Sequence, residues 1–134
     1  MPTIIRRKNI KADTKFSYPV LQEYGIDAST VDAIDPPFAM FHAWEPPAHK
    51  SRPHYHPNCA RGTYYLKGRI RDFFGPDQDQ VLDIEAGDYL YTPKGEVHHG
   101  ELLSDTEPVE IVCVYVGVTS RNAAGKVDVD LKKK

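Results

Sequence analysis

The chain has 134 residues and a mass of 15.1 kDa, which is the size of one ordinary domain. Its 17 Lys and Arg against 19 Asp and Glu give a formal charge of −2, which excludes a strong positive field that would recruit nucleic acid or an anionic membrane. No apolar run approaches the roughly 20 residues of a membrane-spanning helix, and two cysteines are too few for a disulfide framework.

The N-terminal region, residues 1–37, is treated as an extension of the domain. Its opening residues, MPTIIRRKNIKAD, lack the apolar core of a signal peptide, so we expect a cytoplasmic protein. The charge balance and the lack of a spanning segment indicate neither a nucleic-acid nor a membrane partner. Residues 3–10 are compatible with an edge strand. Residues 20–34 have too mixed a pattern to assign, and a short helix is one alternative there.

Short runs rich in Val, Ile, Tyr, Phe and Thr follow, separated by turns that contain Pro, Gly or Asp. We expect strands at 38–44, 63–74, 80–84, 88–92 and 109–118. No stretch sustains helical periodicity over three turns. Several short strands at regular spacing therefore predict an all-β sandwich or barrel in a single domain over 1–134, with a solvated C-terminal tail at 119–134.

Two histidines stand out in the segment RPHYHPNCARG, residues 52–62. Side chains alternate across a strand, so His54 and His56 project to the same face, roughly 7 Å apart along the backbone. Such a pair alone is weak evidence for a metal site, because two polar loop histidines would give the same pattern, so a third ligand is needed. The segment GDYLYTPKGEVHHG supplies one, since a strand, a tight turn and a returning strand would direct His98 or His99 inward. Three neutral imidazoles would hold a transition ion and leave coordination positions open.

These two segments resemble the paired motifs of the cupin superfamily. The first family motif runs Gly, five residues, His-x-His, three or four residues, Glu, six residues, Gly. Here His54, His56 and Gly68 match, Ala48 replaces the first glycine, and Arg61 stands in the glutamate position.

The second family motif runs Gly, five residues, Pro-x-Gly, two residues, His, three residues, Asn. Gly87, Pro93, Gly95 and His98 match, and Leu102 replaces the asparagine. The resemblance spans residues 38–118 and implies a small antiparallel β-barrel, or jelly roll, with this core. It also implies that His54, His56 and His98 bind one divalent transition metal ion per chain.

Arg61 is unusual, because the glutamate that it replaces is the fourth ligand in many cupins. In one interpretation Arg61 points into the barrel and binds an acidic group of the substrate with its planar fork. In the other, Arg61 turns to solvent or pairs with an aspartate of a neighbouring strand. Both alternatives stay open on the sequence alone.

Further site residues follow from strand alternation and from the turns. If Arg61 faces inward, Tyr65 does so too and is a candidate proton donor. Glu96, on the turn before His98, is a candidate general base or a partner for a ligand imidazole, with an exposed turn residue as the alternative. His42 and Trp44 share one strand face and are candidate walls of the substrate pocket, with ordinary packing as the alternative.

Two other residues have expected structural positions. His99 follows His98 and should face the opposite side of its strand. Cys59 is expected to be an exposed loop thiol.

The resemblance covers dioxygenases, lyases, isomerases, decarboxylases, storage proteins and sensors, so fold does not settle function. A three-histidine centre without a carboxylate is similar to cupins that bind non-heme Fe(II). Our leading hypothesis is an Fe(II) dioxygenase acting on a small acidic or enolisable molecule, with Zn, Ni or Mn as alternative ions. A Lewis-acid lyase or isomerase and a non-enzymatic ligand-binding cupin are the alternatives. The resemblance also implies a homodimer, in which residues 3–10 would add a strand to the neighbour's sheet.

Overall fold

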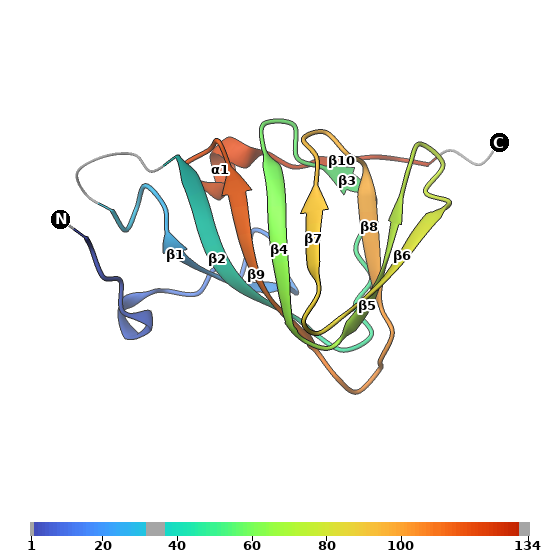
Figure 1. The fold of residues 1–134 in the computed structure, drawn as a ribbon, viewed down its shortest axis with the longest axis horizontal. Helices are drawn as coiled ribbons and strands as arrows, with labels where there is room; N and C mark the ends of the chain where they lie inside the picture. Colours follow the sequence, from blue (N-terminus) through green and yellow to red (C-terminus); the bar gives the residue numbers. More distant parts are fainter. Residues whose placement is uncertain (1, 32–36, 132–134) are drawn as a thin grey trace.

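The computed structural model of the chain describes residues 2–31 and 37–131. Within these residues, ten strands form two five-stranded antiparallel sheets, with the orders β1-β2-β9-β4-β7 and β10-β3-β8-β5-β6 (Figure 1). The strands are β1 (Leu21–Ile26), β2 (Phe38–Glu45), β3 (His54–Tyr55), β4 (Ala60–Lys67), β5 (Arg69–Phe74), β6 (Gln80–Glu85), β7 (Tyr89–Thr92), β8 (His98–Leu102), β9 (Val109–Val116) and β10 (Val127–Asp128). A single turn of 3-10 helix (Arg7–Asn9) and the short helix α1 (Arg121–Ala124) are the helical elements of these residues. The predicted all-β, jelly-roll architecture is confirmed.

The two sheets enclose one hydrophobic core, because alternate residues of each strand point inward. On β9 the buried positions are Val109, Ile111, Cys113 and Tyr115, while the residues between them are more exposed. The second sheet contributes apolar side chains such as Ile70 to the same core. This period of two is the one expected of strands with one buried face, and it decides which side chains reach the interior.

The predicted strand at 63–74 is in fact two strands separated by Gly68. This residue has a φ of 88°, a conformation that favours glycine, and a Cβ there would lie 2.5 Å from the carbonyl oxygen of Pro108. The glycine of the first motif is therefore needed both for its backbone conformation and for the close approach of the chain before β9. Strand β5 consequently begins in the second sheet while β4 ends in the first.

Both ends of the sequence contain structure that was not predicted. Residues 3–10 form no strand but include the 3-10 turn, and residues 21–26 form strand β1 rather than a helix. Residues 32–34 of the unassigned segment lie outside the described residues. Beyond residue 118 the chain forms α1 and then β10, which pairs with β3 at one end of the molecule, where a solvated tail was expected (Figure 1). The lysines at 132–134 lie outside the described part of the chain. Neither described stretch contains a helix long and apolar enough to cross a membrane.

Candidate functional site

Three histidines meet at one end of the space between the sheets. His54 on β3 is the antiparallel register partner of His98 on β8, and His56 follows β3 directly. All three side chains are buried, with exposed fractions of 8%, 6% and 5% for His54, His56 and His98. One ring nitrogen from each lies within 4.8 Å of the others. The structure thus brings together the three residues that the sequence singled out.

Each of these imidazoles is held by a hydrogen bond from its Nδ1 to a backbone carbonyl. The acceptors are the carbonyl oxygens of Arg52 for His54 (2.7 Å), of Gly125 for His56 (2.7 Å) and of Glu96 for His98 (2.9 Å). A carbonyl oxygen can only accept, so Nδ1 must carry the proton and the Nε2 lone pair is left free. The Nε2 atoms of His56 and His98 are buried and have no hydrogen-bond partner. Such fixed, neutral imidazoles are suited to bind a metal ion.

The environment keeps the three histidines neutral at pH 7. Burial lowers the pKa of His54 to about 4 and that of His56 to about 4, and it lowers the pKa of His98 to about 2. The positive charge of Arg61 adds to the effect at each of them. A metal ion binds the neutral form of imidazole, so the donor set fits a divalent transition ion without a proton having to leave first.

Arg61 points into the cavity, which decides between the two alternatives left open by the sequence. It pairs in register with Tyr115, whose side chain is also inward, and both line a cavity of about 300 Å³ that the three histidines share. The Nε of Arg61 is buried and has no hydrogen-bond partner. Among the described residues, no carboxylate oxygen lies within 4.0 Å of the guanidinium to form an ion pair. The cavity therefore contains a guanidinium with unused donor capacity.

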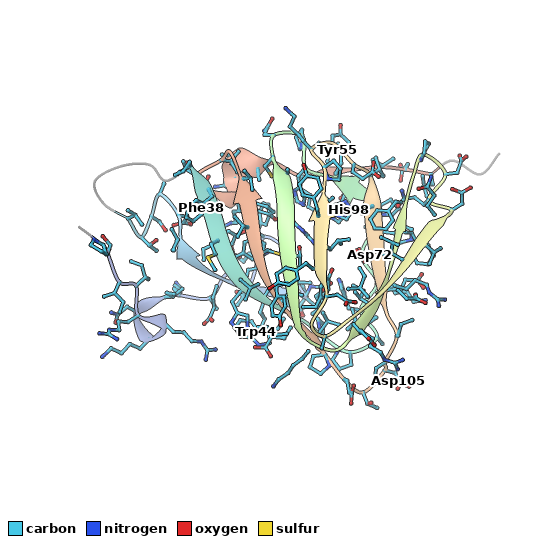
Figure 2. All side chains as sticks on the ribbon, viewed as in Figure 1. Phe38, Trp44, Tyr55, Asp72, His98 and Asp105 are labelled. Carbon is cyan, nitrogen blue, oxygen red and sulfur yellow. The ribbon has the colours of Figure 1, made fainter. Side chains whose placement is uncertain are left out.

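Two carboxyl groups that the sequence reasoning missed line the same cavity. Glu45 ends β2, and Asp72 lies on β5 with an exposed fraction of only 4% (Figure 2). Burial raises the pKa of Glu45 to about 7 and that of Asp72 to about 6, although the nearby charge of Arg61 works against both shifts. Carboxyls with a pKa near neutrality can both give and take a proton under ordinary conditions.

Tyr65 also faces the cavity, as predicted from alternation, and its side chain is 2% exposed. Burial raises its pKa well above the ordinary value for tyrosine, so the phenol stays protonated and can donate a hydrogen bond. The catalytic role suggested for Tyr65 remains a prediction.

Glu96 does not reach this cavity with its side chain. Its residue lines a separate hollow between β6 and β7, and its contribution to the site is the backbone carbonyl that accepts the hydrogen bond from His98. The expected partner of a ligand imidazole is therefore present, but as a main-chain oxygen. The structure gives no support to Glu96 as a general base.

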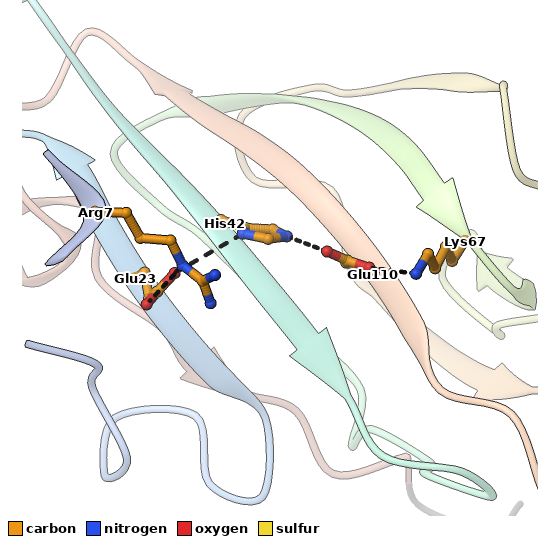
Figure 3. A network of polar contacts seen from close by, with 5 residues as sticks. All are labelled: Arg7, Glu23, His42, Lys67 and Glu110. Atoms are coloured by element: carbon orange, nitrogen blue, oxygen red, sulfur yellow. Dashed lines mark hydrogen bonds and ion pairs between the residues drawn. The ribbon is translucent and has the colours of Figure 1, made fainter. Parts of the chain in front are cut away.

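His42 and Trp44 do not line the cavity, and this expectation is corrected. The inward residues of β2 are Ala39, Phe41 and Ala43, so His42 and Trp44 occupy the opposite face. There the two rings lie 4.0 Å apart between centroids, and His42 Nε2 is 2.7 Å from a carboxylate oxygen of Glu110 (Figure 3).

Two further residues complete the comparison with the sequence. His99 faces away from the three histidines, as expected, and its Nδ1 lies 2.7 Å from the side-chain oxygen of Gln78. Cys59 is 2% exposed and belongs to the core, so its prediction as an exposed thiol was wrong. The C-terminal segment was missed altogether: Lys126 and Asp128 line the cavity next to the carbonyl of Gly125.

Comparison with known proteins gives one family and a set of similar structures. The family described as the cupin domain matches residues 41–115. No curated protein matches the sequence. The polyketide cyclase RemF from Streptomyces resistomycificus superposes with a TM-score of 0.74 at 20% identity, covering 99% of this chain and 89% of the cyclase.

Two other similar structures are longer proteins. An oxalate oxidase in complex with the substrate analogue glycolate gives a TM-score of 0.68 at 16% identity, over 92% of this chain and 62% of the oxidase. The oxalate decarboxylase of Bacillus subtilis, which has Mn(II) centres, gives 0.65 at 21% identity, over 82% of this chain and 28% of the enzyme. These identities show a shared fold. Because the family match covers more than half of the sequence and includes both histidine motifs, the chain belongs to the cupin family.

Proposed function

We propose that this cupin is a metal-dependent enzyme that acts on a small carboxylate or enolisable acid. One observation carries the proposal: three neutral imidazoles, each with a ring nitrogen within 4.8 Å of the others, and a guanidinium with an unpartnered Nε share one cavity. His54, His56 and His98 would hold the ion, which when bound supplies Lewis-acid polarisation of a substrate oxygen. Arg61 would orient the acidic group of the substrate through its planar array of donors.

The charges of the site support an anionic substrate. Three neutral ligands leave the charge of a divalent ion uncompensated, and Arg61, whose Nε is buried, adds a further positive charge to the cavity. An anion that contacts both would relieve this repulsion. Two of the similar structures are named for oxalate, and one of them holds glycolate, so small carboxylates are ligands that this fold accommodates.

For the reaction class, proton transfer in a lyase, isomerase or cyclase has the most support. Glu45 and Asp72 have pKa values near neutrality, and the protonated Tyr65 lies among them in the cavity wall. A proton could pass between these groups and a substrate carbon next to a carbonyl, with each carboxyl returning to its starting state after turnover. The similarity to a polyketide cyclase over nearly the whole chain agrees with such chemistry.

An Fe(II) dioxygenase is the second candidate, because arginine in the glutamate position leaves a ligand set of three histidines. The two classes differ in their need for oxygen. Proton transfer proceeds under anaerobic conditions, whereas a dioxygenase consumes one O₂ for each substrate that it converts.

The experiment is metal analysis of the purified protein, followed by binding of glycolate and oxalate to the metal-loaded form, measured by calorimetry. We expect one ion per chain and carboxylate binding that Arg61→Ala weakens by about 10- to 100-fold while the metal is retained. Arg61→Lys is the matched control, since it keeps the charge but loses the planar fork, and it should recover part of the affinity. Unchanged carboxylate binding in Arg61→Ala would refute the assigned role of Arg61, and absence of any bound ion would refute the metal-dependent enzyme.

A further inference from the structure

The carboxyl of Asp72 lies in the cavity wall without a hydrogen bond to another described residue. The residue is 4% exposed, and it lies on β5 between the inward side chains of Ile70 and Phe74. Within residues 2–31 and 37–131 no donor bonds to its carboxylate, and the one charge that acts on it noticeably is that of Arg61. A carboxyl that is removed from bulk water without a donor normally destabilises the fold. This polar group therefore lacks a partner that the protein itself supplies.

The residue opposite Asp72 on the neighbouring strand is a glycine, which leaves room for the Asp72 carboxyl. Gly100 on β8 is its register partner, and a Cβ on Gly100 would lie 2.7 Å from Asp72 Oδ1 and 2.8 Å from Ile70 Cδ1. Any larger residue at position 100 would displace the carboxyl. Glu45, at the end of β2, lines the same cavity and is also without a hydrogen bond among the described residues. The cavity thus has two carboxyl groups with open acceptor positions in addition to Arg61 and the three histidines.

We propose that Asp72, together with Glu45, forms a second subsite that accepts a hydrogen bond from a hydroxyl group of the substrate. This inference rests on the proposed function, in which the carboxylate of the substrate contacts Arg61. It narrows the substrate to a small carboxylic acid that carries a hydroxyl group away from its carboxylate.

A neutral donor suits this subsite better than an ammonium group. Arg61 already acts on both carboxyls, and Lys50, Lys126 and one further acid, Asp128, also line the cavity. With a divalent ion bound to the histidines, a further cation on the ligand would meet more positive charges than negative ones. A hydroxyl group adds no charge and still satisfies the acceptor oxygens of Asp72.

The experiment compares ligand pairs that differ only in a terminal hydroxyl or methyl group. Metal-loaded protein is titrated by NMR with 3-hydroxypropanoate against butanoate, 4-hydroxybutanoate against pentanoate, and 5-hydroxypentanoate against hexanoate. We expect the hydroxy acid of at least one pair to bind about tenfold more tightly, because a site built to bond a hydroxyl leaves polar groups unpaired when it is missing. Equal affinities within every pair, or tighter binding of the alkyl acids, would overturn the second subsite.

Two variants assign the preference to Asp72. Asp72→Leu should abolish the preference for the hydroxy acid and at the same time raise the melting temperature of the ligand-free protein, because it removes an unpartnered buried carboxyl. Asp72→Asn keeps the shape and should lower the preference at least threefold, and it carries the test if the leucine variant does not fold. Asp83→Asn is the matched control, since this acid lies on β6 in an exposed ion pair with Arg71.

The outcomes separate this inference from the proposed function. If neither member of any pair binds, the site does not bind carboxylates through Arg61, and the proposed function is refuted as well. If both members bind equally in the parent, Arg61 works as proposed and the second subsite is wrong. A hydroxyl preference that persists in Asp72→Leu would also contradict the role of Asp72.

Discussion

The outer face of the first sheet and the cavity between the two sheets carry polar clusters of opposite character. On the outer face, His42 lies between Glu23 and Glu110, and Arg7 and Lys67 close the chain at its ends (Figure 3). Every member of this outer cluster has a polar partner within 4.0 Å: Arg7 and Lys67 each lie beside a glutamate, and His42 lies beside both glutamates. The polar groups of this cluster are satisfied by one another, so the cluster has a structural role and needs no ligand.

In the cavity between the sheets, several polar groups lack such partners. Arg61 Nε and His98 Nε2 are buried without a hydrogen bond, and the carboxyls of Glu45 and Asp72 have no donor among the described residues. Buried polar groups are normally satisfied, and those that are not need an explanation. The comparison shows that pairing, more than residue type, separates a structural cluster from a candidate binding site.

The largest expected effect is the loss of metal binding in His98→Ala. Removing one of three ligands should reduce the bound ion from one per chain to a trace under dialysis, because two imidazoles bind far more weakly than three. Elemental analysis and calorimetry measure this. His99→Ala is the control, since the neighbouring ring faces Gln78 and stacks on Phe73, and it should keep the ion. Equal loss in both variants would contradict the assignment of His98 to the inner site.

The next effect is a pH-dependent gain of stability in Glu45→Gln. Burial raises the pKa of Glu45 from 4.5 to about 7, so the folded protein holds a proton that the unfolded chain releases between these values. The destabilisation by Glu45 is absent below pH 4.5 and grows as the pH rises to about 7. The metal-free variant should therefore match the parent near pH 4 and exceed its free energy of unfolding by about 1–3 kcal/mol at pH 8.

Urea denaturation of both proteins across this range measures the difference, in which the contributions of the histidines cancel. Asp72→Asn provides an internal comparison, because the pKa of the Asp72 carboxyl is raised from 3.8 to about 6. The gain in the free energy of unfolding of Asp72→Asn should therefore be complete at a lower pH than that of Glu45→Gln. A difference that is constant with pH would show that the carboxyl of Glu45 is not held in a buried, unpartnered state.

A smaller effect is expected in the outer cluster. His42→Ala leaves Glu23 and Glu110 without the ring between them and should cost about 1 kcal/mol, a modest value because the three side chains are partly exposed. Denaturation of His42→Ala, Glu110→Gln and the double variant measures their coupling energy. The bound ion should be unchanged. Loss of the ion would contradict the separation of the two clusters, and additive effects of the two substitutions would contradict the pairing of His42 with Glu110.

Local patterns explain why so much of the inner site was predictable. Alternation placed His54 and His56 on one face, and the spacing of the turn residues placed His98 on the returning strand. Each inference used residues close in sequence, where geometry is fixed by the strand itself. The same rule correctly sent Tyr65 inward once Arg61 was inward, although it could not decide the direction of Arg61.

Strand β2 shows where such reasoning fails. Its residues FAMFHAW are apolar on both faces, so alternation allows two orientations and the larger side chains suggested the wrong one. The sheet that packs on the core uses the face with Ala39 and Ala43, because small residues leave room for the opposing sheet and the cavity. His42 and Trp44 were therefore assigned to the pocket in place of Glu45.

Other parts of the site depend on contacts between distant segments. The carbonyl of Gly125 fixes His56 across 69 residues of sequence, and no local pattern announces that pairing. Asp72 did leave a signal, since RIRDFF places an acid between two apolar residues on the same face. An acid on an otherwise buried strand face is a sequence feature that can be searched for.

The smallest expected effect is a gain of stability in Ala48→Gly. Ala48 occupies the first glycine position of the cupin motif and has a φ of 62°, and its N–H donates to the carbonyl of Ser104. A left-handed conformation costs a residue with a Cβ about 1–2 kcal/mol, while glycine loses about 0.5–1 kcal/mol more conformational entropy on folding. The net gain should be about 0.5–1 kcal/mol, measured by thermal denaturation.

Ala28→Gly, in an exposed turn without a positive φ, is the matched control for Ala48→Gly and should lose stability by a similar amount. The pair sharpens the contrast between the clusters. Relief of backbone strain at Ala48 should stabilise the protein with no change in metal or ligand affinity, whereas Asp72→Leu should stabilise it only with loss of the hydroxyl preference. A change of ligand affinity in Ala48→Gly would show that a stabilising substitution outside the site can also weaken binding. The combined effects of Asp72→Leu on stability and on ligand preference would then no longer identify Asp72 as a residue kept for binding.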